Sequence, residues 1–375
     1  MDKRIYNSLL CAILGDIIGF GNGKIEFNND IDMTIHKQSD IPKLCGFNEN
    51  LVATTISLGG ISNYDISKLI YSDDTVMLLA VYNSLKKTLN QSNDKILDEI
   101  AKNMVNDFYN DKDKEKRNYG YRTVKSLQRI KEGENWRSFG FSSSAGGSGA
   151  SMRSMPIGYF YHGIKNRDKL IYLSIMSSRI THNNSTGYLG GLVSALFTAF
   201  IFENLDKQKW PFELLKILKS KKILDIIDEI TRNFPNEKIK HLQNLKKFAN
   251  MWDTYINKRF KNNKFISLFN EKENLSYELK FFSLRSEFYY NNFGSKGYLN
   301  PGSNGCDSTI IAYDCFMDSQ SFESLAYYSM LHVGDSDTTG CIAGALYGAY
   351  HSEKVNIPFP HDKISKLIRT FKIST

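Results

Sequence analysis

The stretch GDSDTTGCIAGALYGAY, residues Gly334 to Tyr350, combines a polar turn with an apolar run rich in small residues. Asp335, Asp337 and Thr338 stand directly before that run, and the run itself predicts a buried helix. A D-x-D pattern on a turn can direct both side chains to one side. Buried carboxylates are costly unless a cation compensates them. The stretch therefore predicts a helix that begins at a cation site.

A second stretch, SDDT at Ser72 to Thr75, has the same character. Asp73 and Asp74 precede an apolar run that predicts a central helix. Taken alone, SDDT is explained by helix capping, since Ser72 is a good N-cap and acidic residues in the first turn favour the helix dipole. Two such stretches in one chain favour a metal instead. If the two helix starts meet, four carboxylates and two hydroxyls converge.

Such a cluster predicts hard divalent cations. All of its donors are oxygens, which suits Mg²⁺ or Mn²⁺ and not zinc or copper. Four carboxylates exceed the need of one Mg²⁺ ion, so two metal ions are expected.

A glycine-rich run, Ala145 to Ala150, is the third element. Small residues let backbone N–H groups approach an anion closely, although many such runs are plain turns. The run does not fit the G-x-x-x-x-G-K-[ST] pattern of a nucleotide-triphosphate loop. From the residues alone, a metal-dependent hydrolase of a phosphate-bearing substrate is expected, and a two-metal phosphatase fits equally well.

Helical periodicity dominates the remaining chain and predicts an all-α protein. Only residues 51–56 form a weak strand candidate, and Gly-, Ser- and Asn-rich loops lie between the helices. The expected helices are 5–18, 75–87, 94–109, 170–180, 188–202, 212–234, 239–260, 308–316, 321–332 and 339–350.

Composition predicts a soluble cytoplasmic protein. The 375 residues carry a net charge of +8, and the lysines are scattered, which favours a solvated surface over nucleic acid. Five cysteines without C-x-x-C spacing favour a reducing compartment. No signal peptide or membrane span is expected. We expect one monomeric domain over residues 1–375, in which 205–274 is a variable Lys- and Asn-rich helical surface segment.

Together these motifs resemble the ADP-ribosylglycohydrolase family, over about Tyr6 to Tyr350. The resemblance is carried by GDIIGFGNGKIEF, SDDT, GGSGASMRSMPIG, THNNSTGYLGGLVSALFTA and GDSDTTGCIAGALYGAY. Within the family the chain looks most like the ADP-ribosylarginine hydrolases, because of NGKIEF, THNNSTGYLG and IIAYDCFMD.

The resemblance implies a compact all-α domain of orthogonally packed helices with two Mg²⁺ ions in a central cleft. It implies hydrolysis of the N-glycosidic bond between ADP-ribose and an arginine of an ADP-ribosylated protein, with release of ADP-ribose. The alternatives are another ADP-ribosyl linkage, O-linked to serine or within poly(ADP-ribose), and a non-catalytic nucleotide-binding relative.

The resemblance also assigns residues. The implied metal ligands are Ser72, Asp73, Asp74, Asp335, Asp337 and Thr338. The implied substrate-binding residues are Gly147, Ser148, Gly149, Met152, His182 and Asp307. His182 has a plain alternative as a satisfied interior histidine.

The catalytic candidates are Asp73 or Asp74 as general base and Glu26 as an acid on a mobile loop. Glu26 lies outside both aspartate motifs, so it is not expected to be a permanent ligand. The chain departs from the family at Tyr298–Pro301 and Gly305–Asp307, where a Trp-Gly-Gly stretch and a Gly-His-Asp triplet are common. These departures concern the arginine side of the substrate.

Overall fold

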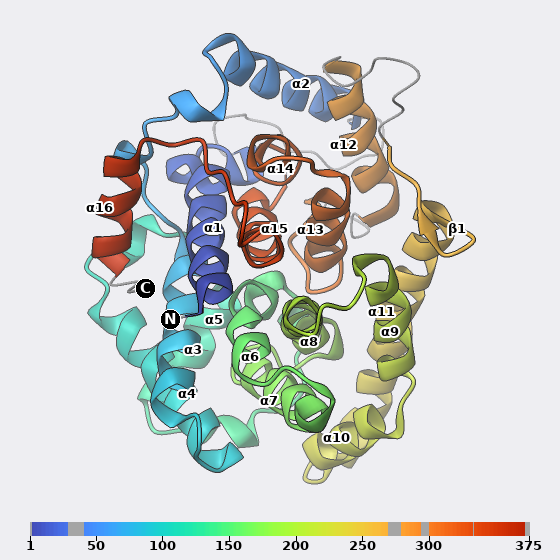
Figure 1. The fold of residues 1–375 in the computed structure, drawn as a ribbon. Coiled ribbons are helices and arrows are strands. Elements are labelled where there is room, and N and C mark those ends of the chain that lie inside the picture. Colours follow the sequence, from blue (N-terminus) through green and yellow to red (C-terminus); the bar gives the residue numbers. More distant parts are fainter. Residues whose placement is uncertain (1, 29–40, 269–278, 294–299, 333, 372–375) are drawn as a thin grey trace. The chain divides into compact units, whose positions relative to one another are not determined.

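Helices form almost all of the regular structure in a computed structural model of the chain (Figure 1). The structure describes residues 2–28, 41–268, 279–293, 300–332 and 334–371. Within these ranges, strand structure is limited to the short antiparallel pair β1 (Phe260–Lys261) and β2 (Lys264–Phe265). The predicted all-α fold is confirmed.

The chain divides into two units. One, here called the terminal unit, comprises Met1–Ser72, Ile266–Ser303 and Ile310–Thr375. The other, the middle unit, comprises Asp73–Phe265 and Asn304–Thr309. The single domain expected for 1–375 stays a prediction.

The terminal unit contains the two chain ends. Its elements are α1 (Lys3–Phe20), η1 (Gly21–Gly23), η2 (Glu26–Asn28), α2 (Ile41–Ser57), η4 (Ile61–Asn63), η5 (Ile66–Lys68), α12 (Leu279–Phe293), most of α13 (Asp307–Asp318), α14 (Phe322–Ser329), α15 (Ser336–Tyr350) and α16 (His361–Phe371).

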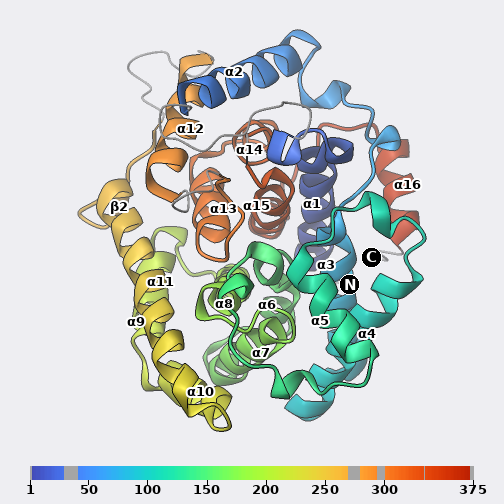
Figure 2. The ribbon, with the colours of Figure 1, turned by 180° about the vertical axis from the view of Figure 1, so that it is seen from behind.

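Helices α1 and α15 pack backbone to backbone, and lie side by side in both ribbon views (Figures 1 and 2). A Cβ atom on Gly15 would lie 2.1 Å from the carbonyl oxygen of Gly340, and one on Gly344 would lie 2.2 Å from that of Cys11. Residues four apart share a helix face, so these glycines form one continuous contact line. We call it the glycine seam; it comprises Gly15, Gly19, Gly340, Gly344 and Gly348.

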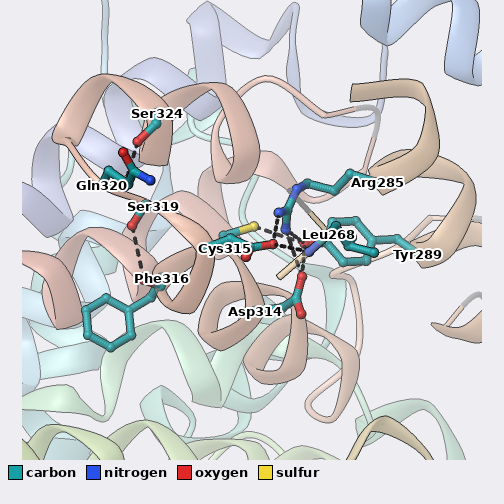
Figure 3. A network of polar contacts seen from close by, with 10 residues as sticks. Leu268, Arg285, Tyr289, Asp314, Cys315, Phe316, Ser319, Gln320 and Ser324 are labelled. Atoms are coloured by element: carbon teal, nitrogen blue, oxygen red, sulfur yellow. Dashed lines mark hydrogen bonds and ion pairs between the residues drawn. The ribbon is translucent and has the colours of Figure 1, made fainter. Parts of the chain in front are cut away.

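A buried charge network joins α12 to α13 (Figure 3). Arg285 donates to Asp314 Oδ2 at 2.7 Å and also to Asp318 Oδ2. The hydroxyl of Tyr289 donates to Asp314 Oδ2 at 3.0 Å. The side chains of Arg285, Asp314 and Asp318 are at most 3% exposed. The network is thus a paired interior ion cluster, as buried charges require.

The middle unit is built around α8 (Ser185–Phe202), a helix buried along nearly its whole length. The other helices are α3 (Asp73–Thr88), α4 (Asn93–Asn110), η6 (Lys114–Lys116), α5 (Tyr121–Lys131), η7 (Trp136–Ser138), η8 (Ser143–Ala145), η9 (Ser148–Arg153), α6 (Met155–Phe160), η10 (Ile164–Asn166), α7 (Arg167–Arg179), η11 (Lys207–Lys209), α9 (Trp210–Leu218), α10 (Lys221–Thr231), η12 (Pro235–Glu237) and α11 (Lys238–Arg259).

Two expectations about elements were wrong. The strand candidate at 51–56 belongs to α2, where Val52 and Thr55 are buried three residues apart on one helix side. Its β-branched residues favour strands locally, but packing of α2 against α12 overrides that preference. The single helix expected over 212–234 is broken between α9 and α10, where Ser220 is extended.

Helices α1 and α8 are each long and apolar enough to cross a membrane. Their apolar windows are 83% and 94% buried inside the structure, which is how core helices behave.

Candidate metal centre and glycine loop

Three acidic side chains of the terminal unit form a carboxylate cluster: Glu26, Asp335 and Asp337. One oxygen atom of each lies within 4.8 Å of the others, and all three side chains are buried. Three carboxylates at this separation repel one another strongly when ionised. The cluster therefore has the donor atoms, spacing and excess charge that suit a hard divalent cation.

The D-x-D turn coincides with the start of α15, where Asp335 is the N-cap and Asp337 lies in the first turn, and a neighbouring loop holds it. The N–H of Asp335 donates to the carbonyl of Pro301 at 3.0 Å. A Cβ atom on Gly334 would lie 2.0 Å from the same carbonyl oxygen, so only glycine allows this approach. Gly302 continues the loop with φ +97°, a conformation that glycine adopts at little cost. Pro301, one of the departures from the family pattern, thus positions the aspartates.

A run of left-handed residues carries Glu26 to the cluster. Gly21, Asn22 and Gly23 have φ values of 52°, 61° and 76°. Directly after Glu26, the N–H of Phe27 donates to the carbonyl of Gly334 at 3.0 Å. This backbone bond brings the Glu26 carboxylate beside the D-x-D turn. The geometry therefore makes Glu26 a candidate ligand as well as a candidate acid, and the expectation that it is not a permanent ligand stays a prediction.

Asp16 contacts a predicted site residue and was missed by the motif reading. It is fully buried in α1, next to Gly15 of the glycine seam, and its Oδ1 accepts the N–H of Ser72 at 2.9 Å. It therefore fixes the predicted ligand Ser72. The sequence could have indicated this role, because Asp16 interrupts an apolar helix and a buried aspartate needs a hydrogen-bond donor.

Asp73 and Asp74 begin α3 of the middle unit, and both are buried. The N–H of Asp73 donates to the carbonyl of Arg117 at 3.1 Å, and its Oδ2 accepts the N–H of Gly120 at 3.4 Å. Burial and the nearby carboxylate of Asp73 raise the pKa of Tyr119 far above its ordinary value, so this phenol stays neutral. The convergence of SDDT with GDSDT stays a prediction.

The glycine loop of the middle unit, residues 145–150, is held by a second segment. Gly147 forms a β-bridge with Asn304, and the N–H of Gly305 donates to the carbonyl of Gly146 at 3.0 Å. Asn304 and Asp307 cap each other, because each side chain accepts the backbone N–H of the other, at 2.9 and 3.1 Å. Asp307 thus stabilises the segment that holds the loop; its contact with substrate stays a prediction.

Two asparagines of the THNN motif hold the approach to the glycine loop. The Nδ2 of Asn184 donates to the carbonyl of Ser142 at 3.1 Å, while its Oδ1 caps α8. The Nδ2 of Asn183 donates to the carbonyl of Phe139 at 2.6 Å. The two asparagines of the motif therefore have a structural role in these hydrogen bonds, which the sequence alone did not predict.

His182 lies against the glycine loop. A Cβ atom on Gly149 would lie 2.8 Å from His182 Cε1, so the glycine makes room for the ring. Burial, and then the positive charges of Arg153 and Arg122, lower the pKa of His182 to about 3. The imidazole is therefore neutral at physiological pH. Ser148 and Met152 are buried in η9, and the contacts of all these residues with ADP-ribose stay predictions.

An all-α scaffold that carries a glycine-rich loop and a buried carboxylate cluster suited to a divalent cation fits a class of hydrolases. The chain belongs to the ADP-ribosylglycohydrolase family, whose model matches residues 1–367. The family uses divalent metals, and the carboxylate cluster fits that property.

Two relatives agree with this assignment, and one solved structure shares the fold. The chain is 34% identical to L444 of Acanthamoeba polyphaga mimivirus, named provisionally as an ADP-ribosyl glycohydrolase, over 94% of this chain and 65% of that protein's length. It is 32% identical to the ADP-ribosylhydrolase ARH1 of Dictyostelium discoideum, over 92% of this chain and 87% of the relative. An ADP-ribosylglycohydrolase-related protein complex shares the fold over both whole chains, with a TM-score of 0.50 and 15% identity.

Proposed function

We propose that this protein is a Mg²⁺-dependent hydrolase that removes ADP-ribose from ADP-ribosylated arginine on proteins. The observation that carries the proposal is the buried cluster of Glu26, Asp335 and Asp337, whose oxygens lie within 4.8 Å of one another. The likeness to ARH1, named as an ADP-ribosylhydrolase, supports the substrate class.

The chain offers enough oxygen donors for two ions. Glu26 now joins the ligand candidates that the motifs supplied, which are Ser72, Asp73, Asp74, Asp335, Asp337 and Thr338. When bound, Mg²⁺ or Mn²⁺ would supply Lewis acidity to ribose hydroxyls and lower the pKa of water.

The protein's own groups account for binding and proton movement. Backbone N–H groups of the glycine loop are donors for the diphosphate of ADP-ribose. The C1″–N bond breaks through an oxocarbenium-like state, and Asp73 or Asp74 accepts a proton from the attacking water. The departing guanidine must end as a guanidinium, and the Glu26 carboxyl is the candidate donor of that proton.

A substrate panel tests the proposal. ADP-ribosyl-arginine, ADP-ribosyl-serine, poly(ADP-ribose) and a simple phosphoester are offered with Mg²⁺, and release of free ADP-ribose or phosphate is measured. We expect turnover of the arginine conjugate, loss of turnover in EDTA and recovery with Mg²⁺ or Mn²⁺. Turnover of the phosphoester alone, or full activity in metal-free protein, would overturn the proposal.

A second candidate is hydrolysis of another ADP-ribosyl linkage, and the departures near Asp307 favour keeping it. Cys306 stands where relatives commonly carry histidine; it is fully buried, and its thiol contacts the carbonyl of Phe248. That position therefore serves the scaffold here. If the serine conjugate turns over faster than the arginine conjugate in the panel, the second candidate replaces the first.

We also propose that the protein works as a monomer in the reducing environment of the cytoplasm. Within the described ranges Cys11, Cys306 and Cys315 are buried thiols outside any disulfide, which supports the reducing compartment.

A further inference from the structure

Arg153 is a buried cation at the end of η9, 1% exposed, and its hydrogen-bond acceptors among the described residues are neutral oxygen atoms. Its Nη1 donates to the carbonyl of Gly149, in the glycine loop. Its Nη2 donates to Thr181 Oγ1 at 2.8 Å and to two carbonyls at the end of α7 at 3.4 Å. One guanidinium therefore ties the glycine loop to the residue that precedes His182.

Thr181 links Arg153 to the His182 imidazole through hydrogen bonds. Its Oγ1 lies 2.7 Å from His182 Nδ1. Arginine has donors only, so Oγ1 must accept from Arg153. Among the described residues, Nδ1 is then the one acceptor within reach of the single Thr181 hydroxyl proton. Were Nδ1 protonated instead, that buried hydroxyl proton would have no acceptor, which is unfavourable. The hydroxyl therefore donates to Nδ1.

The proton of the neutral His182 ring consequently sits on Nε2. A Cβ atom on Gly149 would lie 3.2 Å from Nε2, so this nitrogen faces the glycine loop. His182 is 4% exposed, and within the described ranges Nε2 has no hydrogen-bond partner. A nearly buried donor that faces the glycine loop points to a ligand oxygen. The opposite tautomer would present a lone pair to that oxygen and repel it.

We propose that Arg153 and Thr181 are positioning residues that hold His182 in the Nε2–H tautomer, so that Nε2–H donates to a ligand oxygen together with the glycine-loop amides. The proposal rests on the proposed function in taking ADP-ribose as that ligand. Neither Arg153 nor Thr181 touches the ligand; both act through His182 and Gly149.

The tautomer is measured directly in the unmodified protein. In ¹⁵N-histidine-labelled protein, two-bond ¹H–¹⁵N spectra distinguish the protonated ring nitrogen from the unprotonated one. We expect His182, assigned by its loss in His182→Gln, to show Nε2 protonated at pH 7. A protonated Nδ1 would overturn the proposal whether or not the protein binds ADP-ribose, so this measurement is independent of the proposed function.

Variants of Thr181 test the consequence for binding. Thr181→Val keeps the shape but removes the hydroxyl, and we expect ADP-ribose to bind about tenfold more weakly, with a mixture of His182 tautomers. Thr181→Ser restores the hydroxyl and should restore both properties. Thr231→Val is the matched control, because Thr231 is an equally buried threonine whose hydroxyl donates only to its own helix, at 2.8 Å.

The outcomes separate the two proposals. If wild-type protein fails to bind ADP-ribose while His182 is Nε2–H, the proposed function fails and the positioning role stands. If Thr181→Val and Thr181→Ser both keep the wild-type tautomer and affinity, the positioning role fails. A purely structural effect is recognised because it would lower affinity without changing the imidazole spectrum, and that result also contradicts the proposal.

Discussion

The carboxylate of Glu26 shows how much a single residue's position changes its expected role. Its oxygen lies within 4.8 Å of oxygens of Asp335 and Asp337, in a buried setting where solvent screens the charge poorly. A cation that binds Asp335 and Asp337 would therefore also attract the Glu26 carboxylate. Its two candidate roles, metal ligand and proton donor, are therefore separable only by experiment.

Glu26→Gln removes one charge from the cluster while keeping the size of the side chain. We expect Mg²⁺ to bind about tenfold more weakly or worse, which corresponds to ~1.4 kcal/mol or more. We also expect kcat to fall by about 10² to 10⁴, the range for a lost general acid–base group. Calorimetric titration with Mg²⁺ and single-turnover kinetics at saturating metal measure the two effects.

Glu353→Gln is the control for Glu26→Gln, because Glu353 belongs to the same unit and its side chain is 79% exposed. It should leave both quantities unchanged. Unaltered Mg²⁺ affinity in Glu26→Gln, with a fall in kcat alone, would return Glu26 to a purely acidic role.

At this scale, the sequence predicts residues whose partners are close in the chain. Asp335 and Asp337 were found because a D-x-D turn before a helix is a local pattern. Asp16 was missed because its partner, Ser72, is 56 residues away. Thr181 was likewise read only as part of a motif, since its role depends on Arg153, 28 residues earlier.

At the scale of elements, the glycine seam sets the distance between α1 and α15. Gly344→Ala would place a Cβ atom 2.2 Å from the carbonyl oxygen of Cys11, well inside van der Waals contact. We expect it to destabilise the protein by about 3 kcal/mol or more, although alanine favours helices by about 1 kcal/mol over glycine. Chemical denaturation followed by circular dichroism measures the change.

Gly46→Ala is the matched control for the seam, since Gly46 lies inside α2 and, in the described part of the chain, the added Cβ has no atom within 4 Å. It should be neutral or stabilising by up to about 1 kcal/mol. If both alanine variants unfold alike, close backbone approach does not define the α1–α15 contact.

The ion network of α12 and α13 makes a separate prediction. Arg285→Met leaves Asp314 and Asp318 buried without their cation, and we expect a loss of about 3 to 5 kcal/mol in stability. Adding Asp314→Asn and Asp318→Asn to that variant should recover part of the loss. Thermal unfolding measures all three proteins.

Arg129→Met is the control, because Arg129 also forms an arginine–carboxylate ion pair, with Glu134 at 2.6 Å. The Arg129 and Glu134 side chains are 35% and 46% exposed, so this pair lies at the surface. The substitution should cost less than about 1 kcal/mol. An equal cost for Arg129→Met and Arg285→Met would show that burial of the Arg285 network contributes nothing.

Most helices were predictable because their buried positions recur every three or four residues. The expected helix at 339–350 corresponds to α15 (Ser336–Tyr350), and that at 94–109 to α4 (Asn93–Asn110). The errors arose where local preference and packing disagree, as in α2. The break at Ser220 was missed because the apolar pattern continues on both sides and neither glycine nor proline marks it.

At the scale of the whole molecule, three buried histidines make stability depend on pH. Burial lowers the pKa of His182 and His332 to about 3 and that of His241 to about 4. In the unfolded chain the histidine pKa is about 6.5, so below that pH the unfolded state binds more protons than the folded state. Stability is therefore full above pH 6.5 and falls as the pH drops toward 4.

The slope should reach about 1.4 kcal/mol per pH unit for each histidine. Melting temperatures from pH 7.5 to 5, in EDTA to exclude metal effects, measure it. His241→Phe should reduce the slope by the contribution of one histidine, about 1.4 kcal/mol per pH unit. His361→Phe replaces an exposed histidine of α16 and should leave the slope unchanged. A wild-type slope in His241→Phe would contradict the assignment.

The glycine seam also has a consequence for evolution. An ordinary core absorbs substitutions because side chains change rotamers and neighbours repack, whereas touching backbones have no such freedom. A protein of this kind can exchange much of its interior over time, yet the five seam positions admit a single amino acid. In a library of all single substitutions selected for folded protein, these positions should tolerate no replacement. They should recur every four residues within each of the two helices, α1 and α15.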